Sequence, residues 1–529
     1  MSLKHLSRKE IIFIMLGVML GVLLSSLDSS VVGTAMPKII SDLHGMSEYS
    51  WPFTAYMLCS TIIIPISAKM ADSYGRKLVY LSGIVIFLLT SVLCGLSQNM
   101  IQLIMFRGAQ GLGGGIILSS AFAVVGEIFT PRERGKYMGF VSSMFGLSSL
   151  IGPSLGGLIT DSFGWRWIFY VNIPLGIIAF ITVFLALPSA GEDLEKKRID
   201  YPGLIAFIVG IVPFLLGFTW AGNKYEWLSP EILGMFGFSI VAFVFFYFIE
   251  KKADNPIIPL SLFRNKIFNI SIGALFMGSV TMFGIIIFLP LFVQTVMGKS
   301  ASGSGEIVTP LMLAFVFSSI VAGRIISATG KYKILAIVGF LFVIGGAILF
   351  YMMKPDITDG QLIFNMLVLG VGLGSTMPTF NIAIQNAFPQ NMTGVVTGGV
   401  QFFRNMGSTI GAAIMGSVMM ARMEYHYSQT VQTMSTLTHG ELPPQIATMM
   451  KNPMALKDPG GVIKMKQAMA GTPGLFEKIM GMIHSVLIDS LHDVFFISIL
   501  SSLIALICAI LLKEIPLRGG REKEIAVID

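Results

Sequence analysis

Long apolar stretches separated by short polar segments fill most of this chain. A membrane-spanning helix needs about 20 consecutive apolar residues, and stretches of that length recur along the whole sequence. The first follows a basic head, but it is too long for a signal peptide and lacks a small-residue cleavage site, so we expect it to be retained. The pattern predicts about fourteen spans, near 11–34, 51–70, 78–97, 100–126, 137–160, 167–187, 202–221, 231–250, 267–295, 306–328, 334–353, 361–386, 394–420 and 486–512.

The composition indicates that these apolar helices belong to a protein embedded in a lipid bilayer. Hydrophobic residues make up 54% of the chain and charged residues only 12%, whereas soluble domains carry about 25% charged residues. The three cysteines fall in apolar stretches, so we expect no disulfide framework. The sequence therefore predicts an all-α polytopic membrane protein.

The charges in the loops assign the two sides of the membrane. An even number of spans puts both termini on one side, and Lys and Arg gather in alternate loops, which indicates the cytoplasmic side. The net charge of +7 therefore reports orientation, and we expect no nucleic-acid partner. We predict a multi-pass protein of the cell membrane with both termini in the cytoplasm. The short outer loops hold only Lys38, Arg166, Lys224, Lys299 and Lys354.

Two loops share a spacing that indicates an internal repeat. In "AKMADSYGRK" and "GRIISATGKYK" a small residue, a polar residue, a glycine and a basic residue occur at the same offsets. Repeated helix sets are a common way to build transporters, with the substrate site between the halves. We expect a six-helix bundle at 1–187, an inserted helix pair with flanking loops at 188–265, a second bundle at 266–512 that includes a long outer loop at 421–485, and a tail at 513–529.

Five motifs in order make the sequence resemble a known family. They are "LDSSVVGTAMP", "AKMADSYGRK", "RGAQGLGGG", "GLSSLIGPSLGG" and "WRWIFYVNIPLG". The chain resembles the major facilitator superfamily and, within it, the fourteen-span drug:proton antiporters of the EmrB/QacA type. Gly33, Met36 and Ala68 depart from the usual residues of these motifs. The resemblance implies the major facilitator fold, coupling to protons and transport out of the cell.

One carboxylate, Asp28, lies within the first apolar stretch, where a charge costs about 2.5–3.5 kcal/mol. At ~1.5 Å per residue it lies about 12 Å below the outer end of its helix. Arg107 lies at a similar depth in the fourth span, so the two are expected partners. They can form a static ion pair that joins two helices, or Asp28 can carry the proton while Arg107 tunes its pKa. The resemblance supports the second role.

The first repeated loop is a candidate latch between the halves. Asp72 ends a helix, where the helix dipole disfavours negative charge, so it needs a cation or the N-terminus of a helix in the other half. Arg76 is one candidate partner, and Glu127 can join it. The latch residues are Asp72, Gly75, Arg76 and Glu127; alternatively, the basic residues serve only as topology signals.

The motif on the fifth span is typical of exporters in the family it resembles. Gly152 and Gly156 form a small-xxx-small contact face, and Pro153 bends the helix. We expect this face to be a packing surface that slides during transport, and the alternative is ordinary membrane packing. The full set is Gly146, Gly152, Pro153, Gly156 and Gly157.

In the second bundle, Arg404 is a deep cation with no carboxylate at its depth. It is expected to bind carbonyls, amides, water or substrate. The candidate substrate cavity consists of Asn381, Gln385, Gln401, Arg404 and Asn405.

These features favour a proton-coupled antiporter that exports amphiphilic drugs or toxic compounds by alternating access. The alternatives are an exporter of one native metabolite, lipid or antibiotic, and a non-transporting membrane sensor. The sequence has no phosphate-binding GxxxxGK[ST] loop, no metal-ligand cluster and no nucleophile–base pair, so we expect no enzyme and no ATP-driven pump. The expected partners are a small amphiphilic substrate, protons and the lipid bilayer. We expect a monomer with no cofactor or metal, driven by the proton gradient.

Overall fold

The computed structural model describes residues 7–43, 51–188, 200–222, 224–297, 301–438 and 475–517. Within these residues the chain is built of α-helices, with two short 3-10 helices and no β-strand. The helices are α1 (Arg8–Leu43), α2 (Trp51–Tyr74), α3 (Arg76–Leu96), α4 (Met100–Ile128), α5 (Pro131–Phe163), α6 (Trp167–Tyr170), α7 (Asn172–Ala186), α8 (Tyr201–Trp220), α9 (Pro230–Lys252), α10 (Lys266–Thr295), α11 (Ala301–Thr329), α12 (Lys333–Tyr351), α13 (Asp359–Ala387), α14 (Thr393–Thr438) and α17 (Leu475–Leu511).

The predicted all-α membrane architecture is confirmed. Thirteen stretches of the described residues are long and apolar enough to cross a membrane, with α6 and α7 counted as one. The remaining long helix, α14, is more polar, but it packs against α2, α10 and α17 inside the molecule. Together they account for the fourteen predicted spans.

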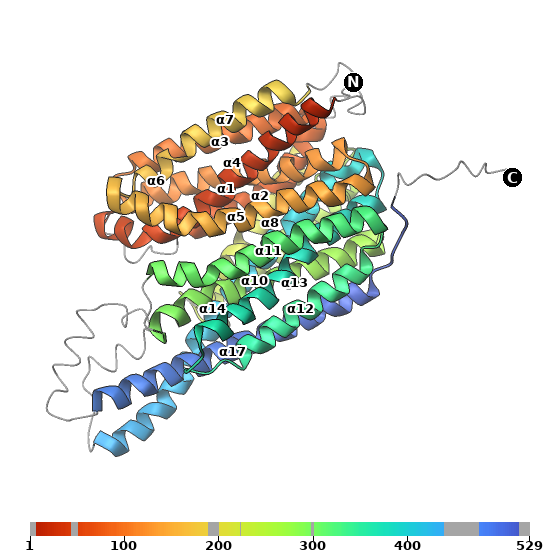
Figure 1. Cartoon of the computed structure of the whole chain (residues 1–529). Coiled ribbons are helices and arrows are strands. Elements are labelled where there is room, and N and C mark those ends of the chain that lie inside the picture. The colour runs from red at the N-terminus through yellow and green to blue at the C-terminus, as the bar shows by residue number, and fades with distance from the viewer. Residues whose placement is uncertain are drawn as a thin grey trace.

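The helices form two bundles with an inserted pair beside them. Figure 1 shows α1–α7 above α10–α17, and α1 begins at the same side of the molecule where α17 ends. That side is called the terminal end below, and the opposite side the distal end. The two bundles meet mainly through α5 against α11 and α2 against α14. The inserted helix α8 packs on both α14 and α2, so the pair touches both bundles.

The expected outer loop at 421–485 is partly helical. Helix α14 continues to Thr438 and α17 begins at Leu475, and Figure 1 shows both helices extending beyond the rest of the bundle. The apolar pattern marks where lipid ends, but a helix needs only its own backbone bonds to continue. The extension is held by Asp493 of α17, which binds Arg422 and His426 of α14 at 3.3 Å each. The rest of this loop (439–474), residues 189–199 of the inserted segment and tail residues 518–529 lie outside the described residues.

The two loops of the predicted internal repeat share a backbone feature. Gly75 and Gly330, which occupy matching positions in the two loops, have φ values of 90° and 73°. Residues with a Cβ rarely adopt positive φ, so a glycine is needed at each turn.

Helices α5 and α11 approach each other so closely at the terminal end that backbone touches backbone. The amide of Lys136 donates to Ser327 Oγ at 3.0 Å, and Ser319 Oγ donates to the Gly139 carbonyl at 3.3 Å. A Cβ on Gly139 would lie 2.7 Å from the Ser319 carbonyl oxygen. The bundles are therefore closed against each other at this end.

A disulfide should form across this contact. A Cβ on Gly135 would lie 2.6 Å from Ser327 Oγ and 2.5 Å from the Gly323 carbonyl oxygen. Gly135→Cys with Ser327→Cys therefore brings two thiols within bonding reach after a small separation of α5 from α11. In a protein whose Cys59, Cys94 and Cys508 are replaced by Ser, mild oxidation should yield the linked peptides in mass spectrometry. The matched control pairs Gly135→Cys with Thr329→Cys, which lies on another face of α11 and should stay reduced. Equal linkage in both pairs would contradict the contact.

Candidate functional site

The two deep charges of the N-terminal bundle are in direct contact. Asp28 of α1 and Arg107 of α4 are each 1% exposed, and Arg107 Nη1 donates to Asp28 Oδ2 at 2.5 Å. The expected pairing is thus present in the structure. Removing two charges from water costs several kcal/mol for each ion, which only good geometry and further hydrogen bonds can offset.

Amide side chains supply those further bonds. Gln110 Nε2 and Asn172 Nδ2 donate to Asp28 Oδ1 at 3.0 and 2.8 Å. Gln110 Oε1 accepts from Arg107 Nη1 at 2.7 Å. Ser91 Oγ accepts from both amides and donates to the Phe169 carbonyl. Asp28 therefore accepts three hydrogen bonds, one from the guanidinium and two from amides.

Sequence reasoning did not identify Gln110, Asn172 or Ser91 as part of the site. A signal existed for two of them, because Gln110 lies inside "RGAQGLGGG" and Asn172 inside "WRWIFYVNIPLG". The family resemblance rests on the residues and the order of these motifs, whereas their amide side chains are the groups that reach the carboxylate. Ser91 on α3 carried no such signal.

An aromatic ring covers the ion pair. Arg107 Cζ lies 4.4 Å from the centre of the Tyr56 ring, a cation–π distance, and Tyr56 Oη lies 3.0 Å from Ser25 Oγ. The glycines of α4 make room for this ring, since a Cβ on Gly111 would collide with the Tyr56 backbone and one on Gly114 with its hydroxyl. Three glycines of the run "GLGGG", Gly111, Gly114 and Gly115, are therefore explained by the close approach of α2 to α4, and Gly113 by the approach of α3.

The glycines of α5 divide between two neighbours. A Cβ on Gly152 would meet Ser30 of α1, and one on Gly156 would meet Val31 and Thr34 of α1. These two glycines pack inside the N-terminal bundle. Only Gly146 of the set faces the other bundle, where a Cβ would meet Val316 of α11. Pro153 lies within α5 beside Gly152, and a Cβ on Gly157 would meet nothing within 4 Å. The sequence pattern shows that the residues on one face of the helix are small, but it does not show which helix packs against that face.

The latch residues meet at the terminal end. Arg76 binds Asp72 at 3.2 Å and also binds Glu127. A Cβ on Gly394, at the N-terminus of α14, would collide with the Arg76 guanidinium and lie 2.9 Å from Asp72 Oδ1. Asp72 thus has both kinds of partner expected for it, a cation and a helix N-terminus of the other bundle. Gly75 provides the turn that places Arg76 there.

Two further contacts join the bundles beside the latch. Gln390 Nε2 donates to the Glu127 carbonyl at 3.0 Å, and Arg134 Nη1 donates to the Gln385 carbonyl at 3.5 Å. Gln385 also donates to Thr397 at 2.9 Å. Of the predicted cavity residues, Gln385 therefore belongs to the closed terminal end in this conformation.

Arg404 lies where the two bundles face each other. Its Cζ is 5.2 Å from the centre of the Phe145 ring on α5, and its other contacts are Met377 Sδ at 3.8 Å and Asn405 Oδ1 at 3.5 Å. Among the described residues no ion pair includes Arg404. Among the predicted cavity residues, five buried atoms have no hydrogen-bond partner in the described part of the chain: Arg404 Nε, Asn381 Oδ1, Gln385 Oε1, Gln401 Nε2 and Gln401 Oε1. Such atoms are available to water or to a polar substrate.

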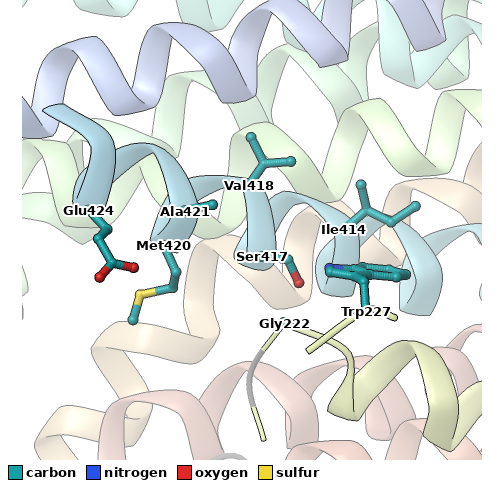
Figure 2. A pocket seen from close by; sticks show the side chains of 8 residues that line it. All are labelled: Gly222, Trp227, Ile414, Ser417, Val418, Met420, Ala421 and Glu424. Atoms are coloured by element: carbon teal, nitrogen blue, oxygen red, sulfur yellow. The ribbon is translucent and has the colours of Figure 1, made fainter. Parts of the chain in front are cut away.

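A cavity that the sequence did not predict lies near the distal end. Its volume is about 690 Å³, and it lies between α14 and the turn that joins α8 to α9. Figure 2 shows Ser417, Met420 and Glu424 on one side of α14, with the Trp227 ring next to Ile414. The other lining residues are Gly222, Val418 and Ala421. The lining is thus apolar with one carboxylate.

No group of three His, Cys, Asp or Glu that could hold a metal ion occurs among the residues the structure describes.

Sequence comparison links this geometry to known proteins. The profile of the Major Facilitator Superfamily matches residues 18–412. The chain is 37% identical over 518 residues to the Multidrug transporter protein MdtP of Bacillus subtilis (strain 168), covering 97% of this chain and 94% of that protein. It is 36% identical over 408 residues to Multidrug resistance protein 3 of the same organism, covering 77% and 79%. It is 31% identical over 509 residues to the MFS-type efflux pump LUC4 of a Fusarium species, covering 94% and 87%.

Solved structures share the fold at low sequence identity. The proton:xylose symporter XylE matches with a TM-score of 0.59 at 13% identity, over 94% of this chain and 95% of that chain. The human organic anion transporter MFSD10 (TETRAN) matches with a TM-score of 0.58 at 15% identity, over 78% and 94%.

The buried ion pair should behave as a unit in stability measurements. Asp28→Asn leaves the Arg107 charge uncompensated and should cost about 3–5 kcal/mol. Adding Arg107→Gln should recover a large part of that loss, because no buried charge remains. Thermal unfolding midpoints of the purified single and double variants give the coupling. The control is the exposed pair of Lys38 and Asp42 on the same helix, whose neutralisation should change stability by about 0–1 kcal/mol. Additive losses at Asp28 and Arg107 would contradict this coupling.

Proposed function

The chain belongs to the major facilitator superfamily, and we propose that it exports amphiphilic drugs or toxic compounds across the cell membrane in exchange for protons. Two relatives that are at least 36% identical to the chain are named as multidrug transport or resistance proteins, and one of them aligns with 97% of it. The five sequence motifs, which occur in order on the first six spans, agree with this assignment.

The observation that carries the proposal is the buried Asp28 carboxylate with its three hydrogen-bond donors. We propose that the proton affinity of this carboxylate changes when its guanidinium and amide donors move away or when water enters. In the proposed cycle Asp28 loads a proton from the outside and releases it to the inside. A proton on Asp28 removes the negative charge that binds Arg107. Protonation therefore weakens the contact between α1 and α4.

Exchange follows if substrate and proton compete for the same state. A cationic or hydrogen-bonding substrate favours ionised Asp28, whereas a proton neutralises Asp28 and so weakens substrate binding. Because Asp28 contributes a single negative charge, we propose neutral or singly charged substrates. The bundles then rock about their contacts, and the Arg76 latch with the α5–α11 contact closes the terminal end during the outward-facing part of the cycle.

The remaining features of the proposal concern location and partners. The loop charges support a cytoplasmic location for both termini, and in that orientation the closed terminal end is the cytoplasmic one. The proton gradient is the energy source, with no cofactor or metal, and the protein works as a monomer that performs no enzymatic reaction. The distal cavity of about 690 Å³ is within the usual range of small-molecule sites, about 300–1,000 Å³.

A second candidate is the export of one native metabolite, lipid or antibiotic by the same mechanism. It is favoured by Arg404, a cation between the bundles with no ion-pair partner among the described residues, because a substrate with an acidic or carbonyl group could bind it. A non-transporting sensor is the candidate of another class.

Asp28→Asn should abolish proton-driven efflux while the protein still reaches the membrane. The measurement is the accumulation of the fluorescent cation ethidium in everted vesicles, with and without an imposed pH gradient. An asparagine keeps the shape of the site but cannot carry a proton, so the gradient-driven signal should fall to that of vesicles without the protein. Asp161→Asn, at an exposed position on α5, is the control and should transport normally.

Other results would redirect the proposal. Gradient-driven efflux by Asp28→Asn at the wild-type rate would remove Asp28 from the coupling. Efflux that requires ATP and ignores uncouplers would reject the mechanism. A wild-type protein that moves no member of a dye panel would favour the narrow exporter or the sensor.

A further inference from the structure

A second group of buried charges lies at the terminal end, where the inserted pair meets α2. Asp200 precedes α8, Glu250 lies in the last turn of α9, and Lys69 lies in α2 five residues before its end. Glu250 is 3% exposed and Lys69 is 9% exposed. None of the five family motifs includes the two acids.

Each acid uses one oxygen for a structural purpose. Asp200 Oδ1 accepts from the Gly203 amide at 3.0 Å and caps α8. Glu250 Oε1 accepts from the Ile257 amide at 3.0 Å and fixes the chain after α9.

The second oxygen of each acid is buried and has no hydrogen-bond partner in the described part of the chain, namely Asp200 Oδ2 and Glu250 Oε2. Both carboxylates border Gly203, since a Cβ there would lie 3.1 Å from Glu250 Oε1 and closer still to Asp200 Oδ2. A buried carboxylate oxygen with no donor is costly, so something should bind it.

The charges of the group do not balance. Asp200 and Lys69 are the charged groups that act on Glu250 from the neighbouring helices α8 and α2. Lys251, Lys252 and Asp254 are exposed next to it. Among the described residues, two carboxylates and one ammonium leave one negative charge, which a proton cancels while also supplying a donor to a free oxygen.

We propose that Asp200 and Glu250 form a proton-binding site that is separate from Asp28. The proton lies on one of the two free oxygens and is shared by the pair, with Lys69 balancing the remaining negative charge. Gly203 allows the two carboxylates to approach, because any side chain there would separate them.

The place of this site in the molecule links it to the latch. Lys69 lies one helical turn before Asp72, which binds Arg76, and α8 also packs on α14 of the other bundle. A proton that changes how strongly the acids hold Lys69 therefore acts on the helix that carries the latch. This link to transport rests on the proposed function, whereas the proton binding itself does not.

Infrared difference spectra during a pH titration test the proton site without any transport. The full chain is reconstituted in lipid as the Asp28→Asn variant, which silences the first site. Protonated carboxyls that are buried absorb at a higher C=O frequency than those in water, so the titration should show a high-frequency band. Adding Glu250→Gln should remove that band, and adding Asp200→Asn should shift or remove it. Glu231→Gln, at the exposed start of α9, is the matched control and should leave it unchanged.

The outcomes separate the alternatives. Glu250→Gln keeps an acceptor for the Ile257 amide, so loss of the band in a variant that elutes as a folded monomer supports the site. Persistence of the band in that variant overturns it, and the acids are then caps only. A band that vanishes when sodium chloride replaces choline chloride assigns the pair to sodium and also overturns it. If ethidium efflux fails while the band titrates as expected, the proposed function fails and the proton site stands.

Discussion

The buried contact between Asp28 and Arg107 is the interaction on which the rest of the N-terminal bundle depends. Two charges that are each 1% exposed are tolerable in an apolar bundle only when they neutralise each other and further hydrogen bonds offset their removal from water. That requirement places Gln110 on α4, Asn172 at the start of α7 and Ser91 on α3 around one carboxylate. Four helices are thus held in register by one acid.

The glycines allow the helices to approach closely enough for these side-chain contacts to form. In lipid there is little hydrophobic drive between helices, so close contact must come from shape and hydrogen bonds. On α4 glycines admit the Tyr56 ring over the guanidinium, and on α5 they let α1 and α11 approach. Gly152 and Gly156 make α5 rigid with α1, while Gly135, Gly139 and Gly146 form the surface that meets the other bundle. Helix α5 therefore has one face that packs on α1 and another face at the interface between the bundles.

The terminal end gathers the contacts that a change of conformation must break. The Gln390 and Arg134 bonds and the α5–α11 contact join one bundle to the other. Arg76, with its ion pairs inside the N-terminal bundle, packs against Gly394 of α14. Most are single hydrogen bonds or partly exposed ion pairs, each worth about 1 kcal/mol or less. A set of weak contacts of this kind can be released together by a modest change in charge, as a proton provides. The buried core of each bundle keeps its packing meanwhile.

The sequence by itself determined the helices, the repeat and the identity of the charged partners. Apolar length reports spans because every backbone group in lipid must be satisfied inside its own helix, and a lone acid and a lone arginine at one depth have few other partners. Helix ends beyond the lipid, as in α14 and α17, escaped this reasoning because hydropathy does not report where a helix stops. Only the tertiary structure decided that Gln110, Asn172 and Ser91 complete the site, that Gly152 and Gly156 face α1, and that Asp200 and Glu250 meet at Gly203. Those facts depend on which faces of separate helices point at one another, and a linear pattern of residues does not encode the rotation of one helix against the next.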